Sequence, residues 1–262
     1  MKKRKLNFII GSIIAAFVLI VILVGFFYTP YDPDKMSLPD KLAGISWKHW
    51  LGCDNTGRDI LSRIMEGAGT TFLVALGTVT FGTVFGTILG AVTGYFGGAL
   101  DSILMRLNDA LFAFPSILLA LVFISLFGRG KIEVVIALGI AFVPSFARIV
   151  RGEFFKQKNL DYVQSARLAG ASHFRIIFVH IMPNILRVLL STIMIGFNNA
   201  VLAEASLSYL GIGVQPPDAS LGSMLSDAQG YFFTTPLYVL APGITIILLV
   251  LGFSLMGEGL KD

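Results

Sequence analysis

The residue types that perform chemistry in proteins are few in this 262-residue chain, and they do not fall into catalytic spacings. A phosphate-binding P-loop needs a glycine, four residues, then Gly-Lys and a hydroxyl residue; the nearest stretch, residues 128–132, lacks the distant glycine and the hydroxyl. The single cysteine, Cys53, cannot form an internal disulfide or a cysteine-cluster metal site. The three histidines show no metal-ligand spacing: His49, His173 and His180. We therefore predict no catalytic residue, no cofactor site and no metal site in this chain.

The composition indicates a membrane protein. Hydrophobic residues make up 55% of the chain and charged residues only 14%, which is more apolar surface than a soluble domain of this size can bury. The formal net charge is +4, but the basic residues are scattered between apolar runs rather than gathered with aromatic residues on one face. Lipid is therefore the expected surrounding medium, and no nucleic-acid partner is expected.

Six stretches are long and apolar enough to cross a bilayer, because a hydrocarbon core of about 30 Å needs about 20 apolar residues in a helix. They are residues 8–28, 70–100, 101–127, 132–150, 176–203 and 228–257. The first stretch is too long for a signal peptide and no small-residue cleavage pattern follows it, so a retained anchor is favoured. Pro236 and Pro242 indicate that the sixth helix begins near one of them.

The predicted fold is an all-α membrane protein with about six transmembrane helices. Residues 1–28 would form a short tail and the first helix, residues 29–69 an external segment, and residues 70–262 a core of five further helices. This core includes a cytoplasmic loop, residues 152–175, between the fourth and fifth helices and an external loop, residues 204–235, between the fifth and sixth.

The distribution of Lys and Arg predicts the orientation in the membrane, since cytoplasmic loops carry the excess of these residues. Lys2 to Lys5 precede the first helix, and residues 148–175 hold six basic residues, whereas residues 204–235 hold none. Residues 29–69 fit less well, because this external segment contains five basic residues beside six acidic ones. We expect a multi-pass protein of the bacterial inner membrane with both termini in the cytoplasm.

Two patterns predict how the helices pack. Four glycines recur every fourth residue in the second helix and form one stripe on which a neighbouring backbone can approach closely: Gly82, Gly86, Gly90 and Gly94. The stripe could face the same chain or a partner subunit, and the same chain is favoured. Arg106 and Asp109 lie three residues apart on one helix face, so we expect them to pair with each other rather than to form a proton relay.

The sequence of the loop between the fourth and fifth helices predicts two short helices joined at Gly170. Asn159 can cap the first helix and Ser172 the second, and Gly170 suits a left-handed ending position. The first helix combines small residues with Tyr162, Gln164 and Arg167. Such a surface could fit a shallow groove on another protein or rest on lipid headgroups, and these residues alone do not decide between the two.

Several motifs resemble those of permeases from ATP-binding-cassette (ABC) importers. Gln164-Ser-Ala166, then Gly170, then Met182-Pro183 is similar to their cytoplasmic loop, although Gln164 replaces the usual Glu, Ser165 an Ala, His180 an Ile and Met182 a Leu. Three further runs resemble the dipeptide, oligopeptide and nickel subfamily: residues 51–63, residues 204–217 with 222–225, and the ending Gly257-Glu-Gly-Leu260. Together these blocks cover nearly the whole chain from Trp50 onward.

The resemblance implies a permease subunit that pairs with a second, related permease. One or two P-loop ATPase subunits would bind ATP and Mg, and an extracytoplasmic solute-binding protein would deliver the substrate. The residues that it implies for ATPase docking on the cytoplasmic coupling helix are Gln164, Ala166, Arg167, Gly170 and Ala171. Those that it implies for contact with the binding protein are Asp54, Gly57, Arg58, Glu204 and Gln215. Arg167 could equally contact a lipid phosphate.

Asn198 and Asn199 lie deep in the fifth helix, where an amide needs a hydrogen-bond partner. They are candidates to line the translocation path, and hydrogen bonds between helices explain them about as well.

Two other classes of protein would leave different patterns in the sequence. An ion-coupled secondary transporter predicts discontinuous helices, ionisable groups near the bilayer centre and an inverted repeat. A membrane-embedded enzyme predicts clustered Ser, His and Asp or metal ligands inside the helices. The sequence shows neither pattern. The substrate stays open among dipeptides, oligopeptides, nickel and metal-chelating opines, all of which are carried by proteins with similar motifs.

Overall fold

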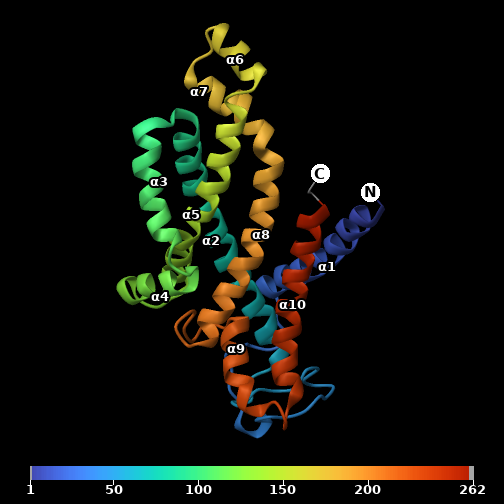
Figure 1. The fold of residues 1–262 in the computed structure, drawn as a ribbon. Helices are drawn as coiled ribbons and strands as arrows, with labels where there is room; N and C mark the ends of the chain where they lie inside the picture. Colours follow the sequence, from blue (N-terminus) through green and yellow to red (C-terminus); the bar gives the residue numbers. More distant parts are fainter. Residues whose placement is uncertain (1, 260–262) are drawn as a thin grey trace.

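The structure is a computed structural model that describes residues 2–259, and it is a bundle of long helices with a helical hairpin at one end (Figure 1). Leu260, part of the predicted ending motif, lies outside the described residues. The helices, in chain order, are α1 (Lys2–Phe27), η1 (Leu38–Asp40), α2 (Ile60–Phe96), α3 (Gly98–Phe112), α4 (Ser116–Phe127), α5 (Lys131–Gln157), α6 (Asp161–Leu168), α7 (His173–Arg175), η2 (Ile176–Ile181), α8 (Met182–Tyr209), α9 (Leu221–Ala228), η3 (Gln229–Tyr231) and α10 (Pro236–Gly259).

Five helical stretches are long and apolar enough to cross a membrane, and a sixth crossing is possible through the bent pair α3 and α4. The five are Leu6–Phe27, Ile60–Phe96, Lys131–Gln157, His173–Tyr209 and Pro236–Gly259. This confirms the predicted all-α membrane fold and the start of the last helix at Pro236. α2 begins at Ile60, ten residues earlier than predicted, because Asp59 caps it by accepting a hydrogen bond from the Ser62 N–H at 2.8 Å.

Residues 101–127, predicted as one membrane-spanning stretch, form two helices instead of one. α3 and α4 meet at an angle of 91° across a break of three residues. The break ends at Pro115, which has no N–H to donate and disfavours helical backbone at Phe114 before it. α4 therefore lies across the bundle instead of continuing α3 (Figure 1).

The glycine stripe of α2 packs against α5 of the same chain, as favoured from the sequence. A Cβ atom on Gly86 would lie 2.5 Å from Cβ of Phe146, and one on Gly90 would lie 2.5 Å from the carbonyl oxygen of Ala147. Real Cβ atoms do not approach other atoms so closely, so the two backbones touch only because these positions lack side chains. α2 and α5 thus form the tightly packed centre of the bundle.

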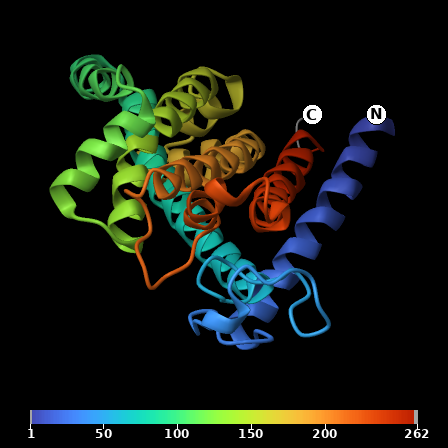
Figure 2. The ribbon, with the colours of Figure 1, turned by 90° about the horizontal axis from the view of Figure 1, so that it is seen from below.

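The other long helices surround this pair. α1 packs along α10, where a Cβ on Gly252 would lie 2.8 Å from the backbone nitrogen of Ala15, and the two helices form one edge of the molecule (Figure 2). α8 lies between α2 and α10. α1 exposes a row of large apolar side chains, including Ile13 at 64% and Phe17 at 59%, as expected for a helix that faces lipid.

α3 is held to α5 by polar contacts, and the predicted pairing of Arg106 with Asp109 is wrong. Asp109 instead accepts a hydrogen bond from Nη2 of Arg148 on α5 at 2.7 Å. Asp101 binds Arg151 through both carboxylate oxygens, each at 2.6 Å. The long arginine side chains of α5 reach across the helix interface, which local spacing along α3 could not reveal.

Replacing Gly90 by alanine is expected to destabilise the protein by about 1–3 kcal/mol, because the added methyl group overlaps backbone atoms of α5. Gly152→Ala is the matched control, since Gly152 lies on α5 with no atom within 4 Å of its added Cβ. The stability of the two variants is measured by thermal unfolding of the purified proteins in detergent. Equal unfolding temperatures for the two variants would contradict the close α2–α5 contact.

Candidate functional site

A short helical hairpin projects beyond the bundle where α5 ends (Figure 1). We call residues 159–175 the docking segment, after the role that the resemblance implies for it; it contains α6, the turn at Gly170, and α7. Gly170 has a φ of +81°, which confirms the predicted left-handed position, and Ser172 Oγ accepts a hydrogen bond from the Arg175 N–H as the predicted cap of α7. Glycine takes this backbone conformation without the steric cost that other residues pay.

Two details of this hairpin differ from the prediction. Asn159 does not cap α6; its side chain donates to the carbonyl of Phe155 at 3.2 Å and so completes the end of α5. The second helix is not separate, because α7 continues through the π-helical turn Ile176–Ile181 into α8. This wider turn lies next to Pro183, which has no N–H to bond the carbonyl four residues earlier.

The docking segment is fixed to three long helices by an apolar cluster. Val163 of α6 is fully buried in it, with side chains from α2, α5, η2 and α8: Ala91, Tyr95, Val150, Phe154, Ile176, Ile181 and Ile185. Tyr95 also shares a hydrogen bond of 2.8 Å with Nδ1 of His173, and Lys158 donates to the carbonyl of Gly94 at 2.8 Å. A movement of α2, α5 or α8 must therefore carry the docking segment with it.

The outward surface of the docking segment contains the predicted residues and two that sequence reasoning missed. Gln164, Arg167 and Gly170 are exposed, while Ala166 and Ala171 are half-buried. Leu168 is 90% exposed and Phe174 is 70% exposed. Their signal in the sequence is two large apolar residues on either side of the Gly170 turn. Exposed apolar side chains of this kind suit a surface covered by another protein or by lipid.

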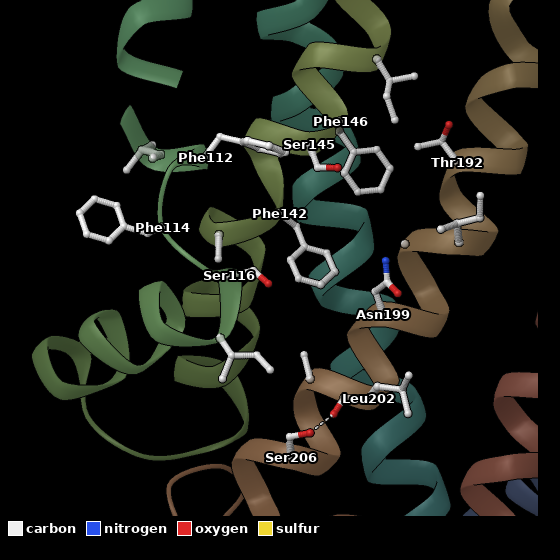
Figure 3. A pocket seen from close by; sticks show the side chains of 17 residues that line it. Phe112, Phe114, Ser116, Phe142, Ser145, Phe146, Thr192, Asn199, Leu202 and Ser206 are labelled. Atoms are coloured by element: carbon white, nitrogen blue, oxygen red, sulfur yellow. Dashed lines mark hydrogen bonds between the residues drawn. The ribbon is translucent and has the colours of Figure 1, made fainter. Parts of the chain in front are cut away.

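A cavity of about 500 Å³ lies between the break in α3–α4, α5 and α8 (Figure 3). Its wall combines aromatic side chains with uncharged polar ones: Phe112, Phe114, Phe142 and Phe146 on one hand, and Ser116, Ser145, Thr192, Asn199 and Ser206 on the other. No charged side chain is among the 17 described residues that line it. The cavity wall can therefore form hydrogen bonds with a solute, but its lining residues carry no charge that would attract or repel one.

The two candidate asparagines of α8 point in different directions. Asn199 lines the cavity (Figure 3). Asn198 faces α10, where its amide lies 3.2 Å from the carbonyl oxygen of Val250 and 3.3 Å from the Ser254 nitrogen and can bond both in one of its two orientations. Successive residues of a helix lie about 100° apart, so the two amides cannot share one face. Asn198 therefore faces a neighbouring helix and Asn199 the cavity, which favours Asn199 as the candidate for the path.

At the opposite end of the bundle, residues 28–59 fold onto the start of α2. The Asp54 carboxylate is buried and accepts hydrogen bonds from the N–H groups of Thr56 and Arg58, and from Arg58 Nε at 2.6 Å. Burial acts to raise the pKa of Asp54, but these hydrogen bonds outweigh it and hold the pKa below its ordinary value. Gly57 has a φ of +82° and its backbone lies against Ser37. Asp54 and Gly57 therefore shape a turn and are not an accessible contact surface.

The predicted contact residue Glu204 is also buried, with no exposed surface. Its carboxylate accepts a hydrogen bond from Ser208 Oγ at 2.7 Å, and the same hydroxyl accepts from the Val214 N–H at 3.0 Å. This pair fixes the chain where it leaves α8, so Glu204 has a structural position. The remaining predicted contacts, Arg58 and Gln215, keep part of their surface exposed.

Comparison with known proteins identifies the family. Residues 82–260 match the family described as the binding-protein-dependent transport system inner membrane component. The chain is 37% identical over 270 residues to the dipeptide transport system permease protein of Haemophilus influenzae, covering 99% of this chain and 90% of that protein. It is 40% identical over 250 residues to the glutathione transport system permease protein of Pectobacterium atrosepticum, covering 94% and 83%.

A solved structure has the same fold. The inward-facing methionine ABC transporter contains a chain that matches with a TM-score of 0.64 and 18% sequence identity, over 74% of this chain and 93% of that one. This protein therefore belongs to the family of binding-protein-dependent transport system inner membrane components. It is a multi-pass permease subunit of an ABC importer, and nothing in the fold or in these relatives favours an ion-coupled secondary transporter.

Cys53 is expected to resist thiol reagents in the folded protein. The side chain is buried, and burial, with a smaller contribution from nearby Asp59, raises its pKa to about 11, so the reactive thiolate is scarce at neutral pH. Maleimide labelling at pH 7.5 should leave native protein unmodified and label it after denaturation. Leu168→Cys, at a site that is 90% exposed, is the positive control. Labelling of Cys53 at the rate of that control would contradict the buried position.

Proposed function

We propose that this chain forms one half of the translocation channel of a bacterial importer for di- or oligopeptides or similar small peptides. The observation that carries the proposal is the identity of 37–40% to permeases named for dipeptide and glutathione transport, over at least 94% of this chain. A second, related permease would supply the other half. A solute-binding protein outside the membrane would select the substrate.

In this proposal the docking segment and both termini lie in the cytoplasm. The six basic residues of 148–175 are concentrated near the docking segment, and Lys2 to Lys5 precede the first apolar stretch. The N- and C-terminal ends of the described chain both lie on the docking-segment side of the bundle (Figure 1). Residues 28–59 and 210–235 would then face the outside, where Arg58 and Gln215 are candidates to contact the binding protein.

The docking segment would bind a P-loop ATPase subunit, which would carry ATP and Mg. α2 is 37 residues long and therefore extends about 55 Å, against a hydrocarbon thickness of about 30 Å. The docking segment packs against the far end of this helix, so it stands well beyond the lipid tails. A groove on the ATPase subunit that covers Leu168 and Phe174 would remove their exposed apolar surface from water.

Coupling requires that the docked energy differ between the inward-open and outward-open states, since a contact equally good in both would shift no population. The buried Val163 and the Tyr95–His173 hydrogen bond make the segment a rigid extension of the long helices. Closure of the ATPase pair would thus move those helices directly. The cavity beside Asn199, with its uncharged polar wall, would form this subunit's share of the path.

Leu168→Asp is expected to weaken co-purification of the ATPase subunit about tenfold or more, because a central exposed anchor of an interface is typically worth at least 1–2 kcal/mol. Transport should fall with it, while the unfolding temperature of the permease stays unchanged since Leu168 is 90% exposed. Leu38→Asp is the matched control, because Leu38 is 83% exposed at the opposite end of the molecule. Equal ATPase recovery from both variants would refute the docking role.

Asn199→Trp is expected to block peptide uptake by filling part of the cavity, with ATPase association retained. Asn198→Ala should show the reverse behaviour: uptake per folded molecule is kept, but loss of the hydrogen bonds to α10 lowers stability by about 1–3 kcal/mol. Uptake in proteoliposomes and thermal unfolding distinguish the two. If Asn199→Trp transports at the wild-type rate, the cavity is not the path.

A further inference from the structure

The segment between α1 and α2 is a fixed structure, not a flexible linker. The Tyr31 N–H donates to Ser62 Oγ at 3.1 Å, and Arg63 Nη1 donates to the carbonyl of Pro33 at 3.2 Å. The Gly52 carbonyl accepts from the N–H of Ile60, the first residue of α2. The segment therefore holds its side chains in set positions relative to the long helices.

A tight turn at residues 46–49 projects from this segment. It is closed by two hydrogen bonds of 2.9 Å, from the Ser46 N–H to the His49 carbonyl and from the His49 N–H to Ser46 Oγ. His49 is buried, bonds Asp59 at 2.8 Å and packs against the ring of Tyr31. These contacts of His49 hold the base of the turn in place.

The turn exposes large side chains that are mostly not covered by the rest of this chain. Trp47 is 96% exposed, Trp50 is 66% exposed, and Ile45 beside them is 69% exposed. These are the only two tryptophans of the protein. Lys48, at the tip, is also exposed. A buried tryptophan removes about 150–250 Å² from water, so a rigid turn that displays two of them needs a surface to rest on.

The position of this turn relative to the hydrocarbon layer follows from the packing and composition of α1 and α2. A Cβ on Gly25 would lie 2.9 Å from Cβ of Met65, so α1 and α2 cross there. The apolar stretch of α1 ends at Phe27, and the uncharged stretch of α2 begins at Gly67, which places the edge of the hydrocarbon layer at this crossing. Ile60 is five residues further out, or about 8 Å along the helix.

The headgroup layer on each side of a bilayer is about 5–8 Å deep. Gly52, whose carbonyl accepts from the Ile60 N–H, therefore lies at headgroup level rather than in bulk water, and Trp50 is two residues from it in the chain. Tryptophan is enriched at this level because its ring is apolar and its N–H polar. Trp47 and Trp50 match that environment, while the exposed Lys48 between them is paired with Asp40, its Nζ donating to Oδ2 at 3.2 Å.

We propose that the turn at residues 45–50 anchors the permease to the phospholipid headgroups of the outer leaflet, with Trp47 and Trp50 embedded among them. The contact fixes the position of residues 28–59 against the membrane at the end of the molecule opposite the docking segment. It rests on the proposed orientation, in which residues 28–59 face the outside, and not on the coupling role or the substrate.

The test is a nitroxide spin label at Trp47→Cys in the assembled importer, reconstituted in phosphatidylcholine nanodiscs with partner subunits free of cysteine. The native Cys53 is buried and stays in place. Collision of the label with molecular oxygen, which concentrates in lipid, is compared with collision with a water-soluble nickel chelate. Phe17→Cys on the exposed face of α1 gives the lipid reference, and Leu168→Cys on the docking segment, 90% exposed and measured without the ATPase subunits, gives the water reference.

The expected result is a nickel accessibility at residue 47 several times lower than at residue 168, with an oxygen-to-nickel ratio between the two references. Lys48→Cys, at the tip of the same turn, repeats the measurement if Trp47→Cys does not assemble. Nickel accessibility equal to that of residue 168 overturns the proposal. So does protection that arises only when the binding protein is added, because the turn would then belong to that interface.

Discussion

The close contact between α2 and α5 is the constraint on which the rest of the molecule depends. Glycines at Gly86 and Gly90 let the two backbones touch, so the helices cannot slide or separate without losing that fit. α2 carries the folded segment 28–59 at one end and contributes Tyr95 to the docking segment at the other. α5 leads directly into α6. A force on the docking segment therefore reaches the opposite end of the bundle through one rigid pair of helices.

α3 and α4 pack against the bundle differently from the α2–α5 pair. Only Met105 and Asn108 of α3 are buried, and arginine–aspartate pairs rather than interlocking apolar side chains hold it to α5. α4 is uniformly apolar and turns across the bundle. This loosely packed wall borders the cavity, whereas the tightly packed α2–α5 pair lies behind it. A transporter needs this combination, since one part must transmit force and another must open.

The end that carries residues 28–59 shows how polar residues can be structural in a transport protein. Asp54, Asp59 and Glu204 are buried; hydrogen bonds reach both carboxylate oxygens of the two aspartates, whereas only the Glu204 oxygen that accepts from Ser208 Oγ has a partner. Together they shape the turn before α2, cap α2 and fix the exit from α8. Motif similarity singled out two of these residues as contacts for a partner. Their burial indicates that such motifs preserve the shape of the surface, which neighbouring exposed groups then present.

The sequence by itself determined the membrane fold, the family motifs, the glycine stripe and the left-handed turn at Gly170, because each depends on composition or on spacing along one helix. Tertiary structure decided the break at Pro115, the partner of Asp109, and which of Asn198 and Asn199 faces the cavity. It also decided that Glu204 is buried and Leu168 exposed. Local periodicity defines the faces of a helix, but what each face meets depends on segments far away in the chain, whose positions only packing fixes.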